Sequence, residues 1–168
     1  MKNRSSARAL ATLSLLVAAA MLLSYVEHLL PGFVPIPGVK LGLANVATVF
    51  ALYTLGRRYA VAVTLVRVLL SALLFGNAVG LIYSVSGAVL ALLGMCVLKS
   101  LPLFSEIGVS VAGGVLHNAG QIVAAALVMK TAGLVAVYLP VLLVSGTVAG
   151  TAIGVASGLL LKQLKGKI

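Results

Sequence analysis

Acidic residues are almost absent from this chain. Aspartate does not occur among its 168 residues, and Glu27 and Glu106 are the only carboxylate side chains. The sequence therefore excludes Asp-based Mg²⁺ or diphosphate chemistry and paired-aspartate mechanisms. Cysteine is nearly as scarce, since Cys96 is the only one. An intrachain disulfide and a thiolate metal cluster are excluded on that ground.

Several motifs of catalysis are also missing. The only Lys-Ser pair, Lys99-Ser100, lacks the glycine loop of a nucleotide-binding P-loop. No HExxH or CxxCH motif occurs, and two separated histidines do not make a metal site. A Ser-His-Asp triad cannot form without aspartate. We therefore predict a protein that is not an enzyme and uses neither a metal nor a cofactor, and a binding or permeation role fits better.

Charge is low overall, while apolar residues dominate. Charged residues make up 8% of the chain and hydrophobic residues 62%, whereas a soluble domain carries about 25% charged residues. We expect a single integral membrane domain over residues 1–168, multi-pass, in a bacterial-type inner (cytoplasmic) membrane. The net charge of +10 is attributed to topology and to anionic headgroups of the lipid bilayer. Nucleic acid is not expected as a partner, because no basic groove with interleaved aromatics occurs.

The apolar runs predict an all-α membrane protein with six transmembrane helices. The expected spans are 9–30, 41–55, 59–75, 81–98, 107–129 and 137–161. An N-terminal signal peptide is the alternative for the first run, because basic residues precede it and AAA follows at 18–20. The apolar run continues through residues 21–26, which favours an uncleaved first helix.

Lysine and arginine are distributed unevenly between the two predicted sides. With the N-terminus inside, the inner segments hold Lys2, Arg4, Arg8, Arg57, Arg58, Lys99, Lys162, Lys165 and Lys167. The outer segments hold only Lys40 and Lys130. The positive-inside rule therefore predicts that both termini are cytoplasmic. The proline-rich stretch PGFVPIPGVKLGLAN, residues 31–45, then forms a stiff outer loop between the first two helices, which we interpret as a lid or rim over a site.

Polar residues gather toward the outer half of the predicted bundle. Arg67 lies roughly 12 Å from the inner end of its span, where a charge costs at least about 2.5–3.5 kcal/mol. It must face the bundle interior, and a small anionic or strongly polar ligand is one partner that it could bind. The predicted ligand-binding residues are Glu27, Lys40, Asn45, Arg67, His117, Asn118 and Gln121. In the alternative interpretation Arg67 is structural and pairs with Glu27 or with backbone carbonyls.

Two rows of small residues at four-residue spacing predict close helix contacts. The row in the sixth span consists of Gly146, Gly150, Gly154 and Gly158. The row in the first span consists of Ala7, Ala11, Ser14 and Ala18. Each row has two interpretations: packing within the chain, or a docking face for a second membrane protein.

Four segments resemble a known family. They are PGVKLGLAN (37–45), LVRVLLSALLFG (65–76), SGAVLALL (86–93) and GVSVAGGVLHNAGQ (108–121). They are similar to the Gx transporter family, whose members are often labelled heptaprenyl diphosphate synthase component I. The resemblance implies kinship with the S components of energy-coupling-factor (ECF) transporters. Those are six-helix proteins that bind vitamins or related molecules from outside and dock on a transmembrane T component driven by two ATPases.

Three functions follow from the residues and the resemblance together. The first is an S-component-like subunit that binds a vitamin, a flavin or an isoprenoid or quinone precursor for uptake. The second is a membrane anchor or accessory subunit of a flavin- or quinone-linked redox system, with an extracytoplasmic flavoprotein as its partner. The third is a non-catalytic component of prenyl diphosphate synthesis. Prenyl diphosphate synthases use aspartate-rich motifs, and the chain has no aspartate, so catalysis by this chain is not expected.

Overall fold

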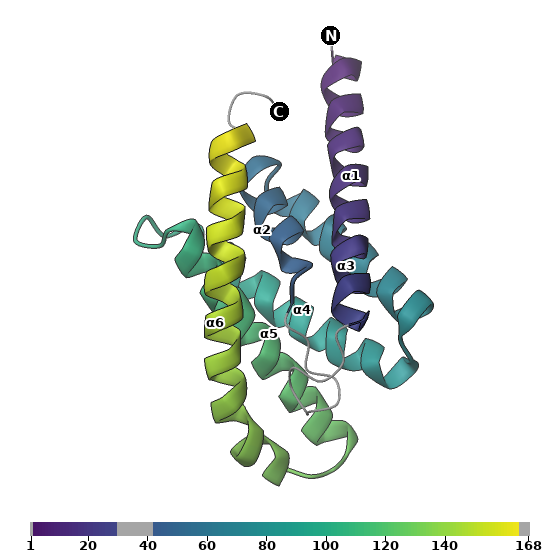
Figure 1. Ribbon diagram of the computed structural model, residues 1–168, viewed down its shortest axis with the longest axis vertical. Helices are drawn as coiled ribbons and strands as arrows, with labels where there is room; N and C mark the ends of the chain where they lie inside the picture. The colour runs from purple at the N-terminus through teal and green to yellow at the C-terminus, as the bar shows by residue number, and fades with distance from the viewer. Residues whose placement is uncertain (1, 30–41, 165–168) are drawn as a thin grey trace.

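The computed structural model describes residues 2–29 and 42–164, with side chains from residue 7 onward. These residues form six α-helices and, within the described ranges, no β-strand. The helices are α1 (Lys2–Leu29), α2 (Asn45–Thr54), α3 (Arg57–Phe75), α4 (Ala78–Leu98), α5 (Glu106–Val128) and α6 (Gly133–Leu164). Figure 1 shows the start of α1 and the end of α6 at the same end of the molecule. This is the arrangement that the predicted topology requires.

Five of the six helices are long and apolar enough to cross a membrane: α1, α3, α4, α5 and α6. This agrees with the predicted all-α, multi-pass membrane protein. The expected second span, 41–55, is represented by only ten helical residues, about 15 Å long, and is not confirmed as a crossing. The helix starts late because Gly42 has φ +78°, outside the helical region, and residues 43–44 form a turn.

The short helix α2 lies inside the bundle. Ala47, Val49, Ala51 and Leu52 are all buried, so successive residues on every side of α2 contact protein. The hydroxyl groups of Thr48 and of Thr64 on α3 form a buried hydrogen bond of 2.9 Å. A helix this apolar all round is stable only where other helices cover it.

Glycine residues bring α5 and α6 together backbone to backbone. A Cβ atom added to Gly150 would lie 2.6 Å from the Cα of Val111, and one added to Gly154 would lie 2.8 Å from the Cα of Ile107. No side chain fits in either place. The predicted row of Gly146, Gly150, Gly154 and Gly158 is buried and is used for packing within the chain. It is therefore not an open docking face, and that alternative is wrong for these four residues.

The contact between α4 and α5 uses the same device. A Cβ atom at Gly120 would lie 2.7 Å from the carbonyl oxygen of Ser86. One at Gly87 would lie 2.7 Å from the carbonyl oxygen of His117. This close approach fixes the turn of α5 that carries His117 against α4.

Helix α1 is much less covered than the others. Its predicted small-residue row, Ala7, Ala11, Ser14 and Ala18, is exposed. Leu15 and Leu22 beside this row are 71% and 67% exposed. In Figure 1 the N-terminal part of α1 stands apart from the remaining helices. Unlike the glycine row of α6, this face is open to lipid or to another protein.

Candidate functional site

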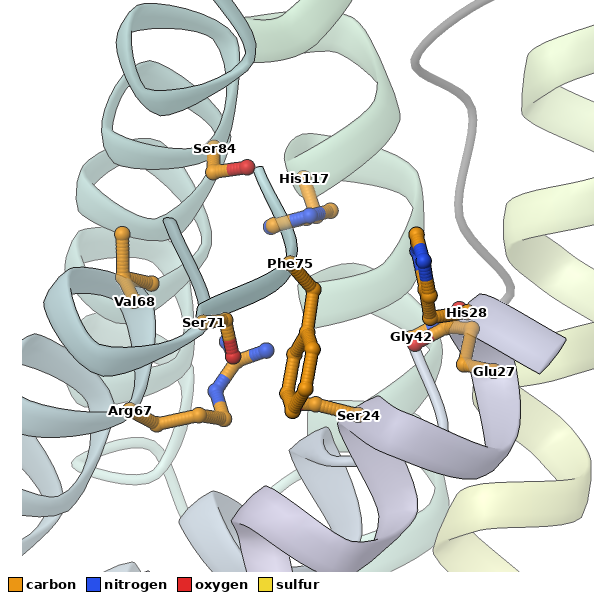
Figure 2. A pocket seen from close by; sticks show the side chains of 10 residues that line it. All are labelled: Ser24, Glu27, His28, Gly42, Arg67, Val68, Ser71, Phe75, Ser84 and His117. Atoms are coloured by element: carbon orange, nitrogen blue, oxygen red, sulfur yellow. The ribbon is translucent and has the colours of Figure 1, made fainter. Parts of the chain in front are cut away.

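A small cavity lies where α1, α3, α4 and α5 meet the start of α2. Its volume is about 50 Å³, enough for a few water molecules. Figure 2 shows the side chains that surround it. They are Ser24, Glu27, His28, Gly42, Arg67, Val68, Ser71, Phe75, Ser84 and His117. The structure thus brings together three of the predicted site residues, Glu27, Arg67 and His117.

Arg67 provides the buried charge of the cavity. The residue is 7% exposed, and its Nη2 donates a 3.3 Å hydrogen bond to the Asn45 side-chain oxygen at the start of α2. Its Nε has no hydrogen-bond partner among the described residues. The carboxylate of Glu27 attracts the guanidinium electrostatically. A guanidinium this deep requires compensating partners.

Glu27 connects the end of α1 to the start of α2. Its Oε1 accepts a hydrogen bond from the backbone N–H of Gly42. Glycine suits this position for two reasons: the positive φ angle, and the close approach of Asn45, whose Nδ2 would lie 2.9 Å from an added Cβ. Glu27 therefore helps to place Asn45, and through Asn45 it helps to orient Arg67.

His117 forms the opposite wall on α5. It is buried, and Figure 2 shows its imidazole at the cavity close to Ser84 of α4. The tight packing of α5 on Gly87 holds the backbone of His117 in place. The cavity therefore has an arginine and a histidine on different helices, with Glu27 as its only carboxylate.

The neighbouring residue Asn118 faces another way. Its Nδ2 donates to the carbonyl oxygen of Leu142 at 2.9 Å and to the Ser145 hydroxyl at 3.2 Å, both on α6. It does not line the cavity. Asn118 thus forms a contact between α5 and α6, and its role in ligand binding stays a prediction. The one-residue step along the helix rotates the side chain by about 100°, enough to reach α6.

Gln121 and Asn45 are buried but are not among the residues that line the cavity. Gln121 is 4% exposed, and neither atom of its amide has a hydrogen-bond partner within residues 2–29 and 42–164. It follows His117 by one helical turn but does not line the cavity. Asn45 acts on the site only through Arg67. Lys40 and most of the proline-rich stretch lie outside the described residues.

Sequence reasoning missed six side chains of the cavity wall: Ser24, His28, Val68, Ser71, Phe75 and Ser84. Helical spacing could have found two of them, because Ser71 and Phe75 follow Arg67 by one and two turns of α3. The Phe75 ring is 5.7 Å from the ring of His28 and 5.3 Å from that of Tyr25. Phe75 and His28 of this aromatic group line the cavity.

The chemistry of the site is that of recognition. An arginine and a histidine can bind an anionic group, and the serine hydroxyls can donate or accept hydrogen bonds. No group of three or more His, Cys, Asp or Glu side chains in the described ranges is placed to hold a metal ion.

The chain matches a family model over residues 16–160, which is most of its length. The family is described as heptaprenyl diphosphate synthase component I. The chain belongs to this family. The resemblance inferred from PGVKLGLAN and HNAGQ is thereby confirmed. No curated protein and no solved structure matches the chain. The part shared with the heptaprenyl diphosphate synthase component I family contains Glu27, His28, Arg67 and His117, so all the ionisable residues of the cavity lie within it.

Proposed function

We propose that this protein is a membrane-embedded binding subunit, similar to an S component, that takes up a small organic solute from the extracytoplasmic side. One observation carries the proposal. Arg67 and His117, both buried and from different helices, line the same cavity beside one carboxylate. Ionisable groups inside a membrane bundle are costly and mark substrate sites more often than structural ones.

The side chains favour an anionic or strongly polar ligand. The Nε of Arg67 is without a partner among the described residues and would bind a carboxylate or phosphate oxygen. Phe75 and Val68 on the cavity wall suit a flat apolar part of the same molecule. Vitamins, flavins and isoprenoid or quinone precursors combine such parts.

Binding requires the cavity to widen. A volume of about 50 Å³ holds a few water molecules, which is less than a vitamin needs. Phe75 is the largest side chain at the cavity and is only partly buried. We propose that this ring moves away from Tyr25 and His28 as the ligand binds.

A binding assay on the purified full-length protein tests the proposal. We expect one member of a panel of vitamins, flavins and isoprenoid diphosphates to bind with a Kd below about 100 µM. Arg67→Ala should weaken that binding at least about thirtyfold, since it removes one partner of a buried charge pair. Thr48→Val, which removes the buried hydrogen bond to Thr64, is the control and should leave binding unchanged. The proposal fails if no compound binds, or if Arg67→Ala binds as the unaltered protein does.

The family description favours a second candidate, a non-catalytic component of prenyl diphosphate synthesis. A diphosphate is an anion that Arg67 and His117 could hold, so the same cavity serves either role. Prenyl transfer in membranes with and without this protein separates the two. Chain-length-dependent synthesis that needs the protein supports this candidate, whereas uptake of a solute with unchanged synthesis supports the first.

The partners remain proposals. The exposed row of Ala7, Ala11, Ser14 and Ala18 on α1 supports docking on a T component with its ATPases. Copurification with an extracytoplasmic flavoprotein, and with no T component, would instead support the predicted redox anchor.

A further inference from the structure

A cluster of positive charge lies far from the cavity, where the α2–α3 turn meets the α4–α5 connection. Arg57 Nη2 donates a 2.6 Å hydrogen bond to the Ser100 hydroxyl. Lys99 Nζ donates to the carbonyl oxygen of Leu52 and lies 4.9 Å from the centre of the Tyr53 ring. The two turns are therefore joined. We call Arg57, Arg58 and Lys99 the basic corner, and it lies about 15 Å along α3 from Arg67.

No ion pair joins the basic corner to an acid within the described residues, although Glu106 acts electrostatically on Tyr53, whose ring Lys99 contacts. Glu27 lies at the cavity, and Glu106, the other acid of the chain, lies beside α6, with Oε1 3.3 Å from where a Cβ of Gly158 would be. Burial, and then the positive charge of Arg57, lower the pKa of Lys99. Like charges are thus held close together, so an anion from outside the chain would stabilise the corner.

Exposed apolar side chains adjoin these cations. Leu103 is 87% exposed, and Leu101 and Phe104 on the same connection are also exposed. Figure 1 shows the α4–α5 connection projecting from the side of the bundle. Basic side chains next to exposed apolar ones, at the ends of membrane-spanning helices, are typical of contact with lipid headgroups and the upper acyl chains.

We propose that the basic corner is a binding site for the phosphate of an anionic phospholipid, with Leu101, Leu103 and Phe104 inserted beside it. Arg57 is preorganised by Ser100 and can offer its remaining donors to a phosphate oxygen. Lys99 adds charge at the same place, and exposed Arg58 can reach the headgroup. This site does not depend on the proposed uptake function, because it shares no residue with the cavity.

Lipid binding to the full-length protein in nanodiscs tests the inference. Discs of phosphatidylcholine with a labelled phosphatidylglycerol probe report the preference for anionic lipid. The double variant Arg57→Gln/Arg58→Gln should lower that preference about fivefold for each arginine removed. Lys130→Gln removes one exposed cation outside the basic corner and should leave the preference unchanged. Leu103→Ser keeps the charge and should weaken lipid binding severalfold.

Each outcome is decisive. The inference is overturned if the double variant retains the original preference. It is also overturned if Lys130→Gln lowers the preference equally, since the effect would then come from the total positive charge and not from the basic corner. Inorganic phosphate at millimolar concentration should not displace the lipid probe. Displacement would show a site for a soluble anion and overturn the assignment to lipid. A thermal melt of each variant in detergent verifies folding, and Leu103→Ser, being at an exposed position, tests the site even if the double variant misfolds.

Discussion

The two halves of this molecule are held together by different contacts. Helices α4, α5 and α6 meet through glycines, so their backbones touch. A Cβ added to Gly114 would lie 2.5 Å from the carbonyl oxygen of Gly146. Helices α1, α2 and α3 meet through side chains, several of them polar. Examples are the Thr48–Thr64 bond and the 3.7 Å contact between the Ser71 hydroxyl and the sulfur of Met21.

These two kinds of helix contact decide where a site can form. Backbone contact leaves no room between helices, so the glycine half provides a rigid wall. Side-chain contact leaves a small cavity, and Glu27 and Arg67 line it from α1 and α3. His117 of α5 and Ser84 of α4 are the contributions of the rigid half. The ligand, in our proposal, binds between a fixed wall and an adaptable one.

The largest effect is expected from breaking the glycine half. Gly150→Leu places a side chain where Cβ alone would be 2.6 Å from Val111 Cα. We expect a loss of about 3 kcal/mol or more in the free energy of unfolding, measured by thermal melting in detergent. Gly133→Leu, where nothing lies within 4 Å of an added Cβ, is the control. Equal melting temperatures for the two variants would show that the glycine contacts do not hold the fold.

A smaller effect is expected in the side-chain half. Asn45→Ala leaves Nη2 of Arg67 without its acceptor, which should cost about 1–3 kcal/mol of stability and also weaken ligand binding. Thr48→Val removes a buried hydrogen bond that lies outside the cavity, so it should lower stability alone. If Asn45→Ala changes stability without changing binding, then the side-chain contacts among α1, α2 and α3 do not position the site.

The smallest effect on stability is expected on α1. Ser14 is exposed, so Ser14→Leu should change the free energy of unfolding by no more than about 0.5 kcal/mol. If α1 docks on a partner through its small-residue row, the same variant should reduce copurification of that partner. If Ser14→Leu greatly lowers the free energy of unfolding, this face of α1 already packs against other residues of the chain.

The sequence predicted the family, the helical class and three of the four ionisable residues of the cavity. Arg67 was predictable because burying it in a membrane is so costly that it has to face inward. The glycine row was predictable as a face in close contact with another helix. Which helix lies against it was not predictable. Only the structure shows that α5 covers it, because spacing identifies a face and not what lies against it.

Two differences between the predictions and the structure have physical causes. Residues 41–55 are apolar throughout apart from Asn45, Thr48 and Thr54, and hydropathy alone does not separate a membrane span from a short helix buried in protein. The turn at Gly42, which is tied to Glu27, delays the start of the helix to Asn45. Asn118 was grouped with His117 by proximity in sequence, although adjacent helical residues point about 100° apart.

That adjacent pair provides the most direct test of the account. His117 lines the cavity and Asn118 bonds to α6, so His117→Ala and Asn118→Ala should separate binding from stability. Ligand affinity and melting temperature are measured on both purified variants. We predict that His117→Ala loses at least about tenfold in affinity with little change in melting temperature, and that Asn118→Ala melts earlier but still binds. Equal affinity for the two variants, or lost binding only in Asn118→Ala, would contradict the assignment of the cavity as the ligand site.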